Sequence, residues 1–561
     1  MSNTKKILGL AIAIFVALPT LFANNERGID LYRAELYDAA KFFFLEKTKQ
    51  GGSEQAESYY YLGQIYNEQQ QADSALYYYA KSKEIDANYP FGYIGEGSLD
   101  LKKGNIKEAE ELFKKAESLA KKNASVMIAV ADAYIEVKQY SEAEKAIAKA
   151  KKINKNYVGI FMAEGDLYRS QENVGQAAKS YDTAISTNAK EKLAYLKSAE
   201  LYKQVNPDVA FEYLDRLIAV DSEYIPAYAL MGDINRGKGR YQQALKAYEK
   251  FISISGVPLL QHQRYAELLY FTDQFDKSLQ EINYVLSKEP DNVVMHRLQA
   301  YNNFKLENYE LGTQQMDAFM QSVPKDQLIY LDYFTYGQLL MKVKRTEDAL
   351  VAFQNAIALD NTKIEIYKEM AGVYLSLANY PQMIEQYEKY FEAEPNATLV
   401  DWLMYANGTY AFAAKFVSAD YKATPISPEQ KTTDDALFYS LIEKANKAYD
   451  RIIELRPTAY QAYRGKARSN ALVDLKEQEE TGTSVMKGVA KPHYEKAIEV
   501  MLASNENGER NRDILEGYRY LASYYLLLDD KENAGVYFKK ILEIDPDNAE
   551  AKNALEVLGI K

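Results

Sequence analysis

The chain has 561 residues, too many for one compact core, and its 47% hydrophobic and 26% charged residues are typical of folded globular protein. This balance excludes a disordered or membrane-embedded chain, and a formal net charge of −12 disfavours nucleic acid and anionic membrane surfaces as partners. Tyrosine is unusually frequent, 49 residues against one tryptophan, which indicates that large amphipathic rings are needed at many equivalent positions.

The N-terminal segment, residues 1–23, has the pattern of a secretory signal peptide. Lys5 and Lys6 precede an apolar run from Ile7 to Leu18, and Ala23 offers a small residue for cleavage. Retention of the segment as an uncleaved anchor is the alternative, although the run is short for a membrane span. Cleavage would remove both lysines and change the net charge from −12 to −14.

The sequence contains no cysteine. An exported protein of this size must then be stabilised by packing without disulfides, and it lacks the thiol that carries the lipid of a lipoprotein. We therefore expect a protein that is secreted across the inner membrane, is periplasmic or associated with the outer membrane, and is not a lipoprotein.

Small residues recur along the chain with a period of about 34 residues. They are Gly63, Gly97, Ala131, Gly165, Ala199, Gly232, Ala266, Ala300, Gly337 and Ala371. A residue that is usually aromatic lies four positions before each of them, and a residue that is usually small lies twelve positions after. A ring one turn before a small residue shares its helix face, so the ring fills space while the small residue lets two helices approach closely.

This pattern resembles the tetratricopeptide repeat family, whose unit is a helix-turn-helix of about 34 residues. The segment from Tyr59 to Tyr66, followed by Ala75 and Tyr79, is similar to the family motif, and so is the last unit around Ala522 and Phe538. The resemblance implies an all-α fold, a right-handed α-solenoid of about fourteen stacked helix pairs. Residues 548–558 are expected to form a terminal capping helix.

The spacing divides the chain after the signal peptide (1–23) into three parts. Residues 24–322 form an N-terminal array, residues 323–397 continue it after three extra residues near Pro324, and residues 398–561 contain two enlarged units. In those units we predict inserted loops at about 414–444 and 476–489, which are either functional or simple drift in loop length. The stretch from Tyr460 to Val500 is similar to a segment of exported tetratricopeptide proteins of the Bacteroidota, which implies a Gram-negative periplasm.

The sequence offers no catalytic or cofactor-binding pattern. It has three histidines, no phosphate-binding glycine loop and no nucleophile elbow, so we predict neither an enzyme nor a cofactor. His262 and His296 occupy the same position in adjacent units. They could share a metal or ligand, but imidazoles that replace tyrosine as packing rings explain them better, so no metal site is predicted.

The first helices of such units line a concave face, on which the family usually holds peptides. One row of this face has acids in five consecutive units, with bases three residues later in three of them, and aromatic side chains follow further along. The candidate partner-binding groove comprises Asp132, Asp166, Arg169, Glu200, Lys203, Asp233, Arg236, Glu267, Tyr270, Tyr301, Phe304 and Phe334. The charges either form solvated i,i+3 pairs within each helix or select a partner, and the aromatic side chains either pack or act as binding hot spots.

The sequence thus predicts a non-catalytic envelope scaffold that binds a peptide or protein subunit in its concave groove. The alternative is a glycan-binding accessory protein whose tyrosines, Tyr270 and Tyr301 among them, stack on sugar rings.

Overall fold

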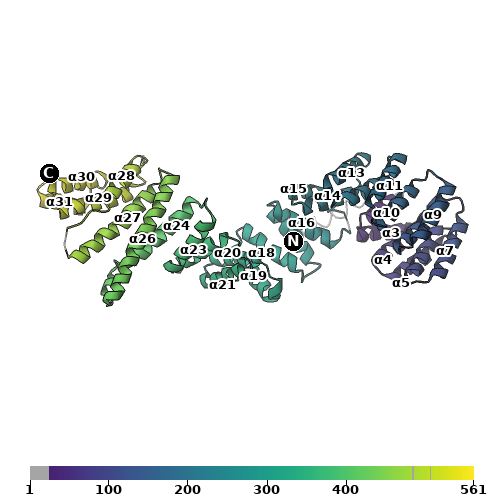
Figure 1. Ribbon diagram of the computed structural model, residues 1–561, viewed down its shortest axis with the longest axis horizontal. Coiled ribbons are helices and arrows are strands. Elements are labelled where there is room, and N and C mark those ends of the chain that lie inside the picture. The colour runs from purple at the N-terminus through teal and green to yellow at the C-terminus, as the bar shows by residue number, and fades with distance from the viewer. Residues whose placement is uncertain (1–24, 255, 483–484, 506, 561) are drawn as a thin grey trace, which may run out of the picture. The chain divides into compact units, whose positions relative to one another are not determined.

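A computed structural model describes residues 25–254, 256–482, 485–505 and 507–560. The described chain is entirely helical and falls into two compact units, which divide between Leu306 and Glu307 (Figure 1). The predicted signal peptide lies outside the described residues. Among those residues, no helix combines the length and the apolar character needed to cross a lipid bilayer.

The first unit consists of helix pairs joined by short turns. Its helices are α2 (Glu26–Arg33), α3 (Tyr37–Gln50), α4 (Gln55–Glu68), α5 (Ala72–Ile85), α6 (Pro90–Lys102), α7 (Ile106–Leu119), α8 (Ala124–Glu136), α9 (Tyr140–Ile153), α10 (Val158–Ser170), α11 (Val174–Thr187), α12 (Lys192–Tyr202), α13 (Pro207–Val220), α14 (Ile225–Gly237), α15 (Tyr241–Tyr248), α16 (Leu259–Phe271), α17 (Phe275–Leu286) and α18 (Val293–Lys305).

The second unit begins with the same arrangement and ends with longer helices. It contains α19 (Tyr309–Ser322), the 3₁₀ helix η1 (Lys325–Gln327), α20 (Tyr330–Lys342), α21 (Thr346–Leu359), α22 (Glu365–Ser376), α23 (Tyr380–Ala393), α24 (Leu399–Lys415), α25 (Ala419–Ala423), α26 (Pro428–Leu455), α27 (Tyr460–Thr481), α28 (Lys491–Leu502), α29 (Asn511–Leu527), α30 (Lys531–Ile544) and α31 (Ala549–Leu558). The three extra residues near Pro324 are accommodated by η1.

The helix pairs confirm the fold that the spacing predicts. Each small residue of the main series lies in the first helix of a pair and is buried, as Gly63 is in α4 and Ala371 is in α22. The residues twelve positions later lie buried in the second helices, as Ala75 does in α5. The predicted capping helix is also present, as α31, whose Ala551 and Leu555 are buried against the preceding pair.

A further regularity accompanies the glycines among these small residues. Where the residue is glycine, the residue sixteen positions later in the second helix is an aromatic ring that lies directly on it. A Cβ atom on Gly165 would lie 2.2 Å from a ring carbon of Tyr181, and one on Gly337 would lie 2.6 Å from Phe353. Where the small residue is Ala131, the residue sixteen positions later is the aliphatic Ile147. In these five pairs glycine makes room for a six-membered ring between two helix backbones, whereas Ala371 has Tyr387 sixteen positions later without a glycine.

The first unit closes on itself. Leu31, Phe43 and Phe44 of the first helix pair share one apolar cluster with residues about 200 positions later, including Tyr248 and Leu268 of α15 and α16. Lys192 of α12 reinforces this closure, since its ammonium lies 3.2 Å from Glu26 and 3.0 Å from Asp30, both in α2, and 3.0 Å from Asp221. The same ammonium lies 4.8 Å from the centre of the Tyr224 ring.

Helix α15 is shortened where the first helix pair docks. It has 8 residues, whereas most second helices of this unit have 14. The chain beyond it contains β-branched Ile252 and Ile254 and then Gly256, which has a positive φ of 81° and lies so close to α3 that a Cβ would be 2.8 Å from the backbone of Ala39. This irregular segment provides the surface on which α3 packs, with Phe251 and Val257 buried.

The two enlarged units of the C-terminal part differ from the prediction. The segment at about 414–444, expected to be a loop, is mostly helix, because α26 begins at Pro428 and runs for 28 residues. Ser427 caps it by accepting a hydrogen bond from the Gln430 amide, and no glycine or proline interrupts the rest of the helix. Helix α27 extends likewise to Thr481, so most of the extra residues lengthen helices and not loops.

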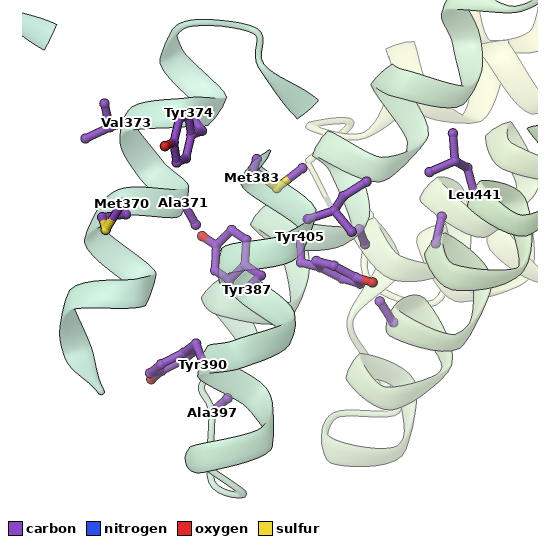
Figure 2. Packing of buried hydrophobic residues seen from close by; sticks show 14 of the residues in the cluster. Met370, Ala371, Val373, Tyr374, Met383, Tyr387, Tyr390, Ala397, Tyr405 and Leu441 are labelled. Carbon is purple, nitrogen blue, oxygen red and sulfur yellow. The ribbon is translucent and has the colours of Figure 1, made fainter. Parts of the chain in front are cut away.

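The core of the second unit is formed mainly by side chains of consecutive helices. Figure 2 shows Met383, Tyr387 and Tyr390 of α23 next to α22, which contributes Ala371, and Tyr405 beside Tyr387. The ring of Tyr387 meets that of Tyr405 edge-on, with centroids 6.0 Å apart. These rings fill the space between neighbouring pairs, as the tyrosine content of the chain suggested.

Substitution of Gly165 by alanine should destabilise the first unit by about 1–3 kcal/mol, because the new methyl group overpacks against the buried Tyr181 ring. The matched control is Gly372→Ala in α22, where no atom lies within 4 Å of the position that the new methyl group would take, and alanine should instead stabilise by about 0.5–1 kcal/mol. Urea midpoints measure both effects, and equal shifts of the same sign would contradict the ring-on-glycine explanation.

Substitution of Lys192 by glutamine should loosen the closure of the first unit. The change removes a cation shared by three carboxylates, and charge-assisted hydrogen bonds of this kind are worth about 1.5–3 kcal/mol. Hydrogen exchange should accelerate in α2 and α3 and stay unchanged in α7 and α9. Unchanged exchange in α2 and α3 would show that the apolar contacts alone maintain the closure.

Candidate functional site

The concave side of the first unit contains a partly open cavity of about 760 Å³. Side chains of the first helices α4, α6, α8, α10 and α12 line it, joined by Tyr32, Arg33, Glu35 and Tyr37 from the α2–α3 pair. Because the unit closes on itself, α2 and α12 reach the same cavity, and a ligand in it would be surrounded by protein on several sides. A volume of this size lies within the range of roughly 300–1,000 Å³ that is common for ligand sites.

Four of the predicted groove residues line this cavity: Asp132, Asp166, Arg169 and Glu200. The other predicted residues of the first unit lie elsewhere on it, from the end of α12 to α18, and are Lys203, Asp233, Arg236, Glu267, Tyr270, Tyr301 and Phe304. Phe334 belongs to α20 in the second unit. The predicted groove is therefore not one continuous site, and its N-terminal third is the part that borders a cavity.

The predicted charges pair between repeats and not within one helix. Lys197 lies 2.5 Å from Asp166, and Arg169 lies 3.3 Å from Glu200, and in each case the partners are 31 residues apart in the sequence. Arg264 approaches Asp233 in the same way, at 3.3 Å. Within the described residues, the expected i,i+3 ion pairs from Asp166, Glu200 and Asp233 do not form. Adjacent first helices lie side by side, so Lys197 and Arg264 reach back to the acid of the preceding repeat, while Arg169 reaches forward to Glu200 of the next one.

Tyrosine hydroxyls from the second helices donate hydrogen bonds to two carboxylates of this row. The Tyr181 hydroxyl donates to Asp166 at 2.7 Å, and the Tyr248 hydroxyl donates to Asp233 at 2.9 Å. These are the same tyrosines whose rings lie on Gly165 and Gly232. One side chain therefore packs two helices together and orients a carboxylate on the concave side.

Asp132 differs from the other acids of the row. Within the part of the chain that the structure describes, its carboxylate has no hydrogen-bond or ion-pair partner. The side chain is open to the water-accessible cavity, but the surrounding helices reduce solvation enough to raise the pKa of Asp132 to about 7. Repulsion from Asp166 adds to this rise, and the nearby Lys197 opposes it.

A cluster of tyrosines lines the part of the cavity next to α2. The rings of Tyr32 and Tyr61 meet edge-on at 5.7 Å, and those of Tyr60 and Tyr61 do so at 5.3 Å. The Tyr32 hydroxyl donates to Glu68 at 3.4 Å, and burial raises the pKa of Glu68 above its ordinary value. The sequence did not single out this cluster, because the α2–α3 pair reaches it through contacts that leave no periodic pattern. Lys197 was also missed, although its regular offset from Asp166, nearly one repeat, could have indicated it.

Most aromatic side chains of the predicted groove pack against other rings or in the core, which is one of the two alternatives that the sequence left open. Tyr301 is 4% exposed and is a packing ring of the core. Tyr270 is half-buried against Phe271 and Phe275, and Phe334 stacks on Tyr330 at 5.4 Å. Phe271 remains 51% exposed, but its ring stacks on Tyr241 at 4.5 Å. The positions of these rings on the first helices therefore bring them into contact with neighbouring side chains, and most of them pack.

The two histidines each have their own partner. His262 Nδ1 lies 2.9 Å from Glu281, and His296 Nε2 lies 2.7 Å from the carbonyl oxygen of Pro290. Both imidazoles therefore serve local packing and hydrogen bonding. Over the described ranges, no group of three or more histidine, aspartate or glutamate side chains is arranged to hold a metal ion.

Comparison with known proteins agrees with this geometry. Tetratricopeptide-repeat family profiles match residues 100–163 and 225–257 in the first unit and 521–548 in the second. The chain thus contains tetratricopeptide repeats in both units, within an all-α array of paired helices.

More distant similarities cover parts of larger proteins. Human protein O-mannosyl-transferase TMTC1 is 21% identical over 210 residues, which are 37% of this chain and 24% of that protein. Human DnaJ homolog subfamily C member 7 is 24% identical over 143 residues, or 22% of this chain and 28% of that protein. The chain thus spans about a quarter of the length of these curated relatives.

Solved structures with similar folds include bacterial repeat proteins. The C-terminal part of a TPR repeat-containing protein from Cytophaga hutchinsonii is 23% identical, with a TM-score of 0.39, and the match covers 52% of this chain and 99% of that one. At this level the likeness concerns the fold alone.

Substitution of Asp132 by asparagine should change how stability depends on pH. The unfolded carboxyl titrates near 3.8 and the folded one near 7, so between these values the folded protein binds the proton more tightly. The contribution of Asp132 to stability therefore falls as pH rises from about 4 to about 7. We expect the melting temperature of the variant, relative to that of the natural chain, to increase as the pH rises from 5 to 8.

The control is Asp215→Asn on α13, a side chain that is exposed and does not line the cavity. Its melting temperature should keep a constant offset from the natural chain over the same range. A constant offset for the Asp132 variant as well would mean that its carboxyl titrates at an ordinary pKa.

Proposed function

We propose that this chain is a non-catalytic scaffold of the bacterial cell envelope that binds a peptide or protein subunit on the concave side of its first unit. Tetratricopeptide repeats mediate protein–protein interactions in general, and the repeats of this chain are a fold that is typically non-catalytic. The observation that carries the proposal is the cavity of about 760 Å³, which successive first helices line with charged and aromatic side chains.

The proposed location rests on the sequence. The N-terminal segment has the pattern of a secretory signal, and a chain without cysteine cannot carry the lipid of a lipoprotein. Periplasmic residence or association with the outer membrane is compatible with both features. Fractionation of cells that produce the natural chain would test it, and recovery in the cytoplasm would contradict it.

The site of binding can be tested by photo-crosslinking in the native cell. A photoreactive amino acid at Arg169, which lines the cavity and is exposed, should form adducts with a partner protein. The same group at Asp215 on α13 should not, because that position does not line the cavity. Mass spectrometry of the adducts would then identify the partner.

The opposite pattern would contradict the proposal. Adducts at Asp215 and none at Arg169 would place the working surface on the second helices. Absence of protein adducts at both positions would argue against a scaffold that uses the first unit.

Glycan binding is the alternative function, and the structure provides less support for it than the sequence did. Tyr301, one of the two tyrosines proposed to stack on sugars, is buried, and Tyr270 packs against neighbouring rings. The tyrosines that line the cavity remain as candidates. Saturable binding on a glycan array, lost on Tyr60→Ala, would favour the alternative over the scaffold.

A further inference from the structure

The charges that line the cavity are unbalanced. Among the described lining residues, six are carboxylates and three are bases. The carboxylates are Glu35, Glu68, Asp132, Glu136, Asp166 and Glu200, and the bases are Arg33, Arg169 and Lys197. The cavity therefore has a surplus of negative charge in a confined space, where charges are screened less than on an open surface.

The three bases already pair with acids of the protein. Lys197 lies 2.5 Å from Asp166, Arg169 lies 3.3 Å from Glu200, and Arg33 lies 4.0 Å from Asp30 in the same helix. A bound anion would have to compete with these carboxylates for its partners. The charges of the cavity thus disfavour acidic ligands and favour cationic ones.

None of these three bases pairs with Asp132. It lies in α8, the middle helix of the five first helices that line the cavity, and Lys197 pairs with the neighbouring Asp166 instead. Glu136, one turn further along α8, has Lys102 as its partner. A cation that enters the cavity could therefore pair with Asp132 without displacing a basic side chain of the protein.

The tyrosine cluster provides aromatic faces against which a cationic side chain can pack. Tyr32, Tyr37, Tyr60 and Tyr61 all line the same cavity. Aromatic faces attract ammonium and guanidinium groups and accept the apolar stem of a long basic side chain. The fold already uses this contact elsewhere, with Lys192 over Tyr224 at 4.8 Å and Lys83 over Tyr93 at 5.1 Å.

We propose that the cavity binds a basic segment of the partner protein, with a lysine or arginine side chain that pairs with Asp132 and packs against Tyr60 and Tyr61. This inference rests on the proposed scaffold function and adds the chemistry of the partner. Its specificity follows from repulsion as well as attraction, because an acidic segment would meet the surplus of carboxylates.

The test uses three fluorescent nine-residue peptides that are identical except at three positions, which are all arginine, all citrulline or all glutamate. Citrulline preserves the shape of arginine and removes its charge. Fluorescence anisotropy with the purified protein at pH 8 should show saturable binding of the arginine peptide. The citrulline peptide should bind at least about ten-fold more weakly, and the glutamate peptide should not bind.

Asp132→Asn tests the assigned carboxylate without endangering the fold, because removal of this charge should raise stability at pH 8. The Asp132→Asn variant should bind the arginine peptide about ten-fold or more weakly than the natural chain does, whereas Asp215→Asn should leave the affinity for this peptide unchanged. Equal affinity for the natural chain and the Asp132 variant would overturn the assignment of this residue.

The outcomes separate this inference from the proposed function. If citrulline or glutamate peptides bind as well as the arginine peptide, and photo-crosslinks still form at Arg169, the cavity binds a partner but not through cationic side chains. If no peptide binds and no crosslink forms at Arg169, both proposals fail.

Discussion

The contact between an aromatic ring and a glycine on the facing helix is the constraint on which five of the regular pairs of this protein depend. Tyr79, Tyr181 and Tyr248 each lie on a glycine sixteen positions earlier, with no space for even one additional carbon. The ring sets the distance between the two helices of a pair, and the pairs in turn determine the face that each first helix presents. Because the ring is that of tyrosine, its hydroxyl also reaches the concave side, where Tyr181 orients Asp166.

The candidate site results from two levels of this organisation. Regular stacking places acids in a row and lets a base from a neighbouring repeat bridge to three of them, as Lys197 does to Asp166. The closure of the first unit then adds the residues of α2 and the beginning of α3, which no regular array would bring to that row. The concave shape and the negative charge of the cavity result from both, since a flat row of paired charges would be better solvated and less selective.

Much of the fold could be predicted from the sequence, because one spacing repeats and each repeat buries its apolar face in the same way. The helix pairs from α4 to α23 and the capping helix α31 follow from that spacing. The extended helix α26 was missed even though Ser427 and Pro428 carry a helix-start signal, because the segment departs from the repeat. Four of the predicted groove residues line the cavity, but their ion-pair partners were not predicted, because a contact between neighbouring helices depends on their relative register and not on the pattern within one helix. The docking of α3 against Phe251 and Gly256 could not be predicted at all, since contacts between residues about 200 positions apart leave no periodicity.

The same closure gives the first unit a folding order that an open array lacks. In an open stack each repeat touches only its neighbours, so folding can begin anywhere and spread. Here the first helix pair docks on a surface that α14 to α16 contribute. Closing a loop of this length has a high entropic cost, which falls once the intervening repeats have folded and bring the two ends close together. The first helix pair can therefore reach its final position only after α14 to α16 have folded. The apolar residues Phe43 and Phe44 stay uncovered on that side until α14 to α16 are made, and apolar surface exposed in this way favours aggregation.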